Sequence, residues 1–295
     1  MKSCNLCPRR CGAPREAHRG KGFCGMGELP VVARAALHFW EEPCISGTRG
    51  SGTVFFTGCT LQCVFCQNYQ ISTERAVGEA LTPRALSGLF FRLAAQGAHN
   101  INLVSGAQFV PAIAEALSMR PLPIPVVYNS GGYESLEALQ MLEGLVQIYL
   151  PDYKYDDPAL AARFSGAPDY VETARSAILE MVRQTGPCVT GADGVLQRGT
   201  IVRHLLLPGH TRNTRAALDW LGANLPAGVW VSLMAQYTPC GAAGKFPELA
   251  RRVTRREYEK AQAHLFALGL DGFVQELSSA HKTYIPPFDL EGVKG

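Results

Sequence analysis

The most informative segment of the sequence is Gly58-Cys59-Thr60-Leu61-Gln62-Cys63-Val64-Phe65-Cys66-Gln67-Asn68. Its three cysteines have the spacing C-x3-C-x2-C and directly follow the apolar run 53–57. Cysteine thiolates are the usual ligands of iron–sulfur clusters, and a [4Fe–4S] cluster has four irons to ligate. Three cysteines therefore leave one iron open for a small molecule. A zinc knuckle or buried free thiols are the alternatives, but structural zinc uses four closed ligands, and the triplet offers three.

Length and composition indicate a globular α/β protein. The 295 residues, 47% of them hydrophobic and 18% charged, suit one large domain or two small ones. A net charge of +3 without a basic stripe excludes nucleic acid as the expected partner. The first residues lack the apolar segment of a secretory signal, and no apolar run approaches the ~20 residues of a membrane span. We therefore expect a cytoplasmic protein with no membrane partner.

A second cysteine group lies at the N-terminus, with the spacing C-x2-C-x3-C-x12-C. Ten cysteines in a reducing compartment point to metal ligation more than to disulfides. Zinc would make the second group a closed structural site, whereas another [4Fe–4S] cluster would carry electrons. The spacing does not choose between the two metals. The predicted ligands of this group are Cys4, Cys7, Cys11 and Cys24.

From residue 53 onward, short apolar runs alternate with helical patterns. Strands are expected at 53–57, 100–104, 124–129, 146–151, 200–207 and 229–234, and helices near 82–95, 108–118, 134–143, 168–185 and 212–223. This alternation predicts βαβ units and a parallel sheet. In barrels of such units, functional residues gather at the carboxyl ends of the strands.

The sequence before and after this alternation of strands and helices indicates less about structure. Residues 30–52 contain a strand or a short helix, 247–272 a charged helix, and the tail around 278–288 is expected to cover the barrel. The domain prediction is a Cys-rich extension (1–52), a core (53–240), and a C-terminal helix with a covering tail (241–295).

The cysteine triplet resembles that of the radical S-adenosylmethionine (SAM) superfamily, in which an aromatic residue often precedes the third cysteine, as Phe65 does here. Cys66-Gln67-Asn68 is similar to the Cys-His-Asn of the enzymes that activate pyruvate formate-lyase. Together with the N-terminal Cys-Pro-Arg-x-Cys, the chain looks most like an uncharacterised, PflX-like branch of homologues of those activases. The resemblance implies a partial (β/α)6 barrel, a [4Fe–4S] cluster on Cys59, Cys63 and Cys66, and SAM on the open iron.

The same resemblance assigns SAM contacts at the strand ends. Asp152 and Lys154 match the family's Asp-x-Lys and share one face of a strand by alternation. Arg203 matches an arginine that binds the SAM carboxylate, and a guanidinium in an apolar strand needs an anionic partner. The remaining predicted contacts are Phe65, Asn68, Ser105, Gln108, Asn129 and Gln236.

Two of these positions depart from the activases. Ser105-Gly106-Ala107-Gln108 stands where the activases have Gly-Gly-Glu, and Gln236 stands near their histidine. These differences set the chain apart from the true activase subgroup.

The resemblance implies an oxidoreductase that reductively cleaves SAM and abstracts hydrogen from a substrate. That substrate is a glycine of a partner protein, as for the activases, another peptide, or a small metabolite. The electron donor would be a flavodoxin or a ferredoxin. The alternative is a non-catalytic protein, either an iron–sulfur electron carrier or a zinc-stapled interaction domain, which would not need Asp152, Lys154 or Arg203 at strand ends.

Overall fold

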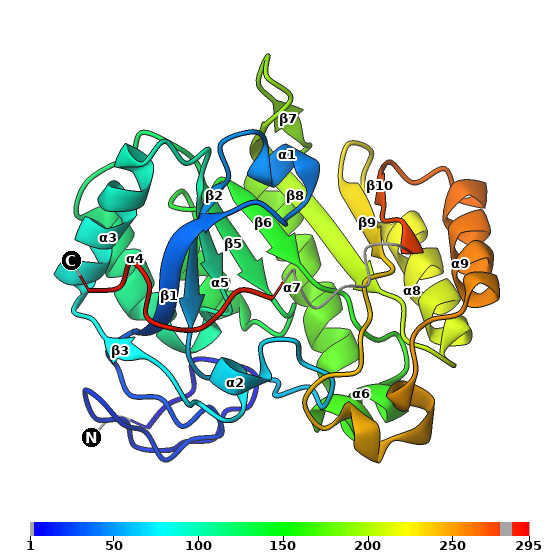
Figure 1. Cartoon of the computed structure of the whole chain (residues 1–295), viewed down its shortest axis with the longest axis horizontal. Helices are drawn as coiled ribbons and strands as arrows, with labels where there is room; N and C mark the ends of the chain where they lie inside the picture. Colours follow the sequence, from blue (N-terminus) through cyan, green and yellow to red (C-terminus); the bar gives the residue numbers. More distant parts are fainter. Residues whose placement is uncertain (1–2, 278–284, 295) are drawn as a thin grey trace.

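The computed structural model describes residues 3–277 and 285–294 and has an α/β architecture built on one curved sheet (Figure 1). Six strands form at the predicted places and pair with one another in chain order, all parallel. They are β2 (Ser51–Phe56), β4 (Ile101–Val104), β5 (Val126–Ser130), β6 (Ile148–Pro151), β8 (Leu196–Leu205) and β9 (Trp230–Met234).

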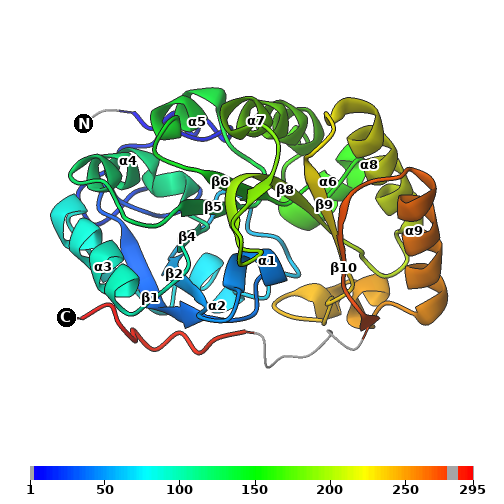
Figure 2. The same ribbon diagram turned by 90° about the horizontal axis from the view of Figure 1, so that it is seen from above.

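The predicted helices connect these strands. They are α3 (Pro83–Ala95), α4 (Val110–Ser118), α5 (Leu136–Leu142), α7 (Tyr170–Thr185) and α8 (Thr211–Asn224). Figure 2 shows them along the outer side of the curved sheet. Every residue of β2 is buried, as is typical of a parallel strand covered on both faces. The α/β prediction with a partial barrel is confirmed.

The sheet extends past the predicted core at both edges. β1 (Val31–His38) pairs antiparallel with β2 and carries the short β3 (Glu79–Ala80) on its other side. β10 (Gly272–Val274) adds to β9 in parallel, and β7 (Val189–Thr190) forms a small hairpin with β8. Residues on both sides of the predicted boundaries at 52 and 240 therefore belong to one sheet.

Short helices fill the connections. Among them, α1 (Pro43–Ser46), α2 (Tyr69–Ser72) and α6 (Pro158–Ser165) were not predicted. Figure 1 places α1 at the end of the sheet where the parallel strands begin, and α2 with the N-terminal segment at the end where they finish. Different segments of the chain therefore lie at the two ends of the sheet: α1 at one end, and α2 with the N-terminal segment at the other.

The predicted helix over 247–272 is wrong in its extent. Pro247–Ala250 forms only a 3-10 turn, and α9 spans Arg255–Ala267. Thr254 and Glu257 form a capping box, in which each side chain bonds the other's backbone N–H. This reciprocal cap satisfies donors that a helix start leaves open, so it fixes the start of α9 after the turn.

The C-terminal segment returns along β1. Leu290 donates its backbone N–H to Ala33, and Ala35 donates to Glu291. Ile285 and Phe288 pack near Phe55, and part of the tail expected to cover the barrel, 278–284, lies outside the described residues. In the portion of the chain that the structure describes, no helix has both the length and the apolar character needed to cross a membrane.

Candidate active site

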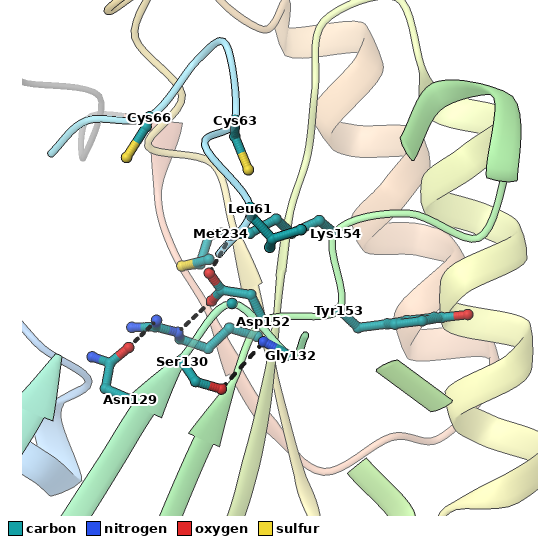
Figure 3. Close-up of polar contacts among 12 residues, drawn as sticks. Leu61, Cys63, Cys66, Asn129, Ser130, Gly132, Asp152, Tyr153, Lys154 and Met234 are labelled. Carbon is teal, nitrogen blue, oxygen red and sulfur yellow. Dashed lines mark hydrogen bonds and ion pairs between the residues drawn. The ribbon is translucent and has the colours of Figure 1, made fainter. Parts of the chain in front are cut away.

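The cysteine triplet lies in the loop between β2 and α2, at the carboxyl end of the sheet. Cys63 and Cys66 direct their sulfurs to the side on which Asp152 and Lys154 lie (Figure 3). Cys59, Cys63 and Cys66 all line one cavity of about 200 Å³ and form no disulfide. The turn that follows an apolar strand therefore brings three free thiols to one wall of a cavity.

Hydrogen-bond donors surround the three sulfurs. Ser165 donates its hydroxyl to Cys63 Sγ at 2.9 Å, and Ser72 donates to Cys66 Sγ at 3.2 Å. The backbone N–H of Leu61 donates to Cys59 Sγ at 3.3 Å. Burial raises the pKa of the Cys66 thiol to about 12 and also raises that of Cys63. Because burial disfavours the ionised thiols, a thiolate at these positions needs positive charge nearby, such as that of iron.

Asp152 joins two cations on the cavity wall. Its carboxylate accepts from Arg203 Nε at 2.8 Å. It also pairs with Lys154 (Figure 3). Burial alone would raise the pKa of Asp152, but Arg203 and Lys154 outweigh burial and hold the pKa below its usual range. Burial would likewise lower the pKa of Lys154, and Asp152 outweighs it and raises the pKa. Both residues follow the end of β6 at Pro151, and they form a charged pair at the carboxyl edge of the sheet.

Arg203 finds its anionic partners within the chain itself. Besides Asp152, its Nη1 donates to Glu41 at 3.1 Å, and its Nη2 donates to Asn129 at 2.6 Å. Glu41 also accepts from Asn129 and from Asn102. The resemblance predicted that this arginine binds the SAM carboxylate, whereas here each of its nitrogens already has an acceptor.

The sequence analysis missed Glu41. It lies between β1 and α1, where the chain enters the sheet from the end opposite the cysteines, and it lines the same cavity as His38 and Trp40. Burial raises its pKa, with Arg203 opposing that effect. Two adjacent acids beside an apolar segment, Glu41 and Glu42, were the available signal.

The cavity brings together most of the predicted site. Its lining includes Cys59, Cys63, Phe65, Cys66, Asn68, Ser105, Asn129, Asp152, Lys154, Arg203 and Gln236. Ser105 directly follows β4 and has a φ of 59°, a left-handed conformation that is unfavourable for a non-glycine residue. Such strain is concentrated at functional sites.

Gln108 lies elsewhere. Its amide donates to the carbonyls of Thr57, Gly58 and Ser105, so it fastens the start of the triplet loop instead of facing the cavity. It lines a second, smaller pocket together with Thr60 and the four N-terminal cysteines.

The four N-terminal cysteines surround this second pocket: Cys4, Cys7, Cys11 and Cys24. Cys11 is exposed, and Arg15 donates to Cys4 Sγ at 3.8 Å. In residues 3–277 and 285–294, no three His, Cys, Asp or Glu side chains converge closely enough to hold one metal ion. A cube does not require that convergence, because each of its ligands binds a different iron.

His204 predicts a pH dependence of stability. It is fully buried on the side of β8 away from the cavity, bonded to the Tyr153 carbonyl at 2.6 Å and to Thr214 at 3.0 Å. Burial lowers its pKa to about 4 from 6.5. The unfolded chain therefore binds this proton first, and stability is lost as pH falls from 6.5 through 4, by up to about 3 kcal/mol.

In His204→Asn, we expect the loss of stability between pH 6.5 and pH 4 that is due to His204 to disappear. The asparagine amide still donates to the Tyr153 carbonyl, but it does not titrate. Thermal unfolding of both proteins at pH 7 and pH 5 measures it. The difference in Tm between wild type and variant should be smaller at pH 5 than at pH 7. Equal decreases in Tm for the two proteins would contradict the assignment of this pH dependence to His204.

Comparison of the sequence with known proteins identifies the family to which the chain belongs. The chain is 30% identical to the uncharacterized protein MJ0674 of Methanocaldococcus jannaschii over 270 residues, which cover 88% of this chain and 73% of that protein. The chain belongs to the MJ0674 family. No protein-family model matches this member of the MJ0674 family.

Solved structures resemble this MJ0674-family member in fold. Methylornithine synthase (PylB) aligns with a TM-score of 0.51 and 13% identity, covering 82% of this chain and 72% of that one. HydG, a maturase of the [FeFe]-hydrogenase, aligns with a TM-score of 0.50 and 12% identity over 79% and 54%. A radical SAM methyltransferase from Sphaerobacter thermophilus aligns at 0.49 and 15% over 76% and 65%. The MJ0674-family chain has the radical SAM fold.

Proposed function

We propose that this protein is a radical SAM enzyme. One observation carries the proposal: the three triplet cysteines and the charged strand-end residues Asp152, Lys154 and Arg203 line a single cavity. In a fold of this kind, ligands bind at the carboxyl ends of the strands. An electron carrier needs only a fully ligated cluster, and a zinc-stapled domain needs only a closed site, so neither alternative accounts for that cavity.

The triplet fits a [4Fe–4S] cluster. Its thiols are free, share one wall of the cavity, and each accepts a hydrogen bond, from Leu61, Ser72 or Ser165. Hydrogen bonds to the sulfurs are among the features that tune such clusters. When bound, the cluster supplies the electron that splits SAM into methionine and a 5′-deoxyadenosyl radical.

The chain's own residues would place SAM and keep water out. Asp152 and Lys154 present a carboxylate and an ammonium beside the triplet, where SAM carries an ammonium, a carboxylate and a ribose. Asn68, Ser105 and Gln236 add amide and hydroxyl groups on the same cavity. Further predicted contacts are Phe65, Asn129 and Arg203. Gln108 acts in this proposal by holding the triplet loop at its start.

The substrate and partners follow the resemblance. We propose hydrogen abstraction from a substrate that is a glycine Cα of a partner protein, as in the activases, another peptide, or a small metabolite, with a flavodoxin or ferredoxin as the one-electron donor. Cys4, Cys7, Cys11 and Cys24 would hold a second metal centre, either [4Fe–4S] or zinc; zinc would require these side chains to move closer together, because no three of the described side chains converge on one ion. The ratio of iron to zinc per chain after anaerobic purification distinguishes these two metals.

The test of the proposal is anaerobic SAM cleavage. We expect the reconstituted, dithionite-reduced protein to convert SAM to equal amounts of methionine and 5′-deoxyadenosine, measured by liquid chromatography and mass spectrometry. The oxidised protein with SAM is the control and should give neither product. A reduced, iron-loaded protein that neither cleaves SAM nor changes its electron paramagnetic resonance (EPR) spectrum on adding SAM would refute the proposal.

A further inference from the structure

Arg9 lies between the two cysteine groups. It follows Cys7 by two residues, and its side chain crosses to the loop that carries the triplet. There its Nε donates to the carbonyl of Thr60 at 2.9 Å, and its Nη2 to that of Leu61 at 3.4 Å. Thr60 directly follows Cys59. One guanidinium therefore holds the backbone between the first and second triplet cysteines.

The same guanidinium holds the end of α6. Nη2 donates to the carbonyl of Ser165 at 2.8 Å, and Nη1 donates to that of Gly166. Ser165 in turn donates its hydroxyl to Cys63 Sγ. Arg9 thus reaches the triplet by two routes, through the backbone beside Cys59 and through the serine that bonds Cys63.

Aromatic rings and carbonyls fix the position of Arg9. The guanidinium carbon lies 4.0 Å from the ring centroid of Phe23 and 5.3 Å from that of Tyr133. All of its hydrogen bonds in the described residues go to backbone carbonyls. A planar fork with several donors can make all of these contacts at once, whereas a lysine ammonium can keep only some of them. The side chain therefore acts as a brace between two backbone segments.

The N-terminal segment around Arg9 has little regular structure of its own. Phe23 directly precedes Cys24, and its carbonyl accepts from Gln62 in the triplet loop at 2.8 Å and from Arg75 at 3.0 Å. Residues 3–30 contain no helix and only isolated bridges, so hydrogen bonds of loop residues hold this segment, and a metal shared by its thiols would restrain it further. Metal held by those thiols would set where both residues sit.

We propose that Arg9 is a positioning residue that couples the N-terminal cysteine site to the triplet. With the N-terminal thiols holding metal, Arg9 keeps the backbone at Thr60 and Ser165 in the geometry that binds the triplet's cluster. This inference rests on the triplet binding a cluster, as proposed above, and does not depend on SAM cleavage or on which metal the N-terminal site takes.

Cluster retention tests the coupling. Arg9→Gln and Arg9→Lys are compared with Arg10→Gln, a matched control whose side chain is 70% exposed and whose nearest ionic partner, Glu137, is 4.0 Å away. Reconstituted proteins are mixed anaerobically with an iron chelator, and the loss of cluster absorbance is followed. We expect loss about tenfold faster in Arg9→Gln, the effect of roughly one lost charge-assisted hydrogen bond, with a smaller change in Arg9→Lys and none in Arg10→Gln.

Spectroscopy separates positioning from general destabilisation. The EPR signal of the reduced triplet cluster should broaden or shift in Arg9→Gln and return toward wild type in Arg9→Lys, at temperatures well below Tm. Unchanged chelator kinetics and EPR in Arg9→Gln would overturn the inference, even if the enzyme cleaves SAM.

A second arm removes the N-terminal site itself. The variant with serine at Cys4, Cys7, Cys11 and Cys24 should lose its triplet cluster as fast as Arg9→Gln, and adding Arg9→Gln to it should cause no further acceleration. Full retention in the four-serine variant, or additive effects, would overturn the coupling. If the cluster responds as expected and SAM is never cleaved, the proposed function fails and the coupling stands.

Discussion

Cys63→Ala should leave the protein without its triplet cluster and reduce SAM cleavage to the level of a reaction lacking enzyme. The remaining Cys59 and Cys66 ligate only two irons of a cube, and the Ser165 hydroxyl that donates to Cys63 Sγ loses its acceptor. Because reductive cleavage uses the cluster's electron, no residual route remains. Iron per chain, absorbance near 400 nm and 5′-deoxyadenosine yield, each relative to wild type, measure the loss.

Cys188→Ala is the matched control for this result. Cys188 is partly buried, bonds the Thr200 carbonyl through its thiol, and lies outside the cavity. It should keep the iron and cleavage activity of wild type. Iron content in Cys63→Ala equal to that of Cys188→Ala would assign the cluster to other cysteines.

Asp152→Ala is expected to destabilise the fold by about 3–5 kcal/mol, the cost of leaving a buried charge without its partner. The carboxylate is the acceptor that Arg203 Nε and Lys154 share. Without it, Glu41 and Asn129 still bind Arg203, whereas Lys154 keeps no carboxylate partner among the described residues. Urea unfolding of the two proteins without metal measures the difference in free energy of unfolding.

The double variant Asp152→Asn, Lys154→Met provides the comparison. Removing both charges leaves no unpaired ammonium, so the double variant should be more stable than Asp152→Ala, and the effects of its two single substitutions should not add. A loss below about 1 kcal/mol in Asp152→Ala would show that water solvates this pair and that its charges are not buried.

The sequence predicted the parallel core well, because each strand is an apolar run followed by a turn and an amphipathic helix. It left β1 undecided between strand and helix, since Val31–His38 has apolar residues on both faces. The length of α9 was overestimated because charge patterning continues through 247–254, while the capping box at Thr254 starts the helix later.

The candidate site was predictable only in part. Asp152 and Lys154 were predicted to lie together, and they do, although both follow the end of β6 at Pro151 and strand alternation is not what pairs them. That Arg203 needs an anion also followed from the sequence, but the identity of that anion did not, because Glu41 reaches it from a segment 162 residues earlier in the chain. Gln108 was assigned by its position after β4, whereas its amide turns to the backbone at Thr57 and Gly58.

The return of the C-terminal segment along β1 bears on how the molecule avoids self-association. β1 is nearly an edge strand, since β3 covers only Val31 and Val32 on that side. Backbone bonds of residues 290–291 to Ala33 and Ala35, and the pairing of Arg34 with Asp289 and Glu291, cover the middle of that side. An exposed edge is a template for strand addition by another chain. A protein that ends after Pro286 keeps the cavity residues Ile285 and Pro286 but loses this cover, and it would therefore form β-aggregates beginning at β1.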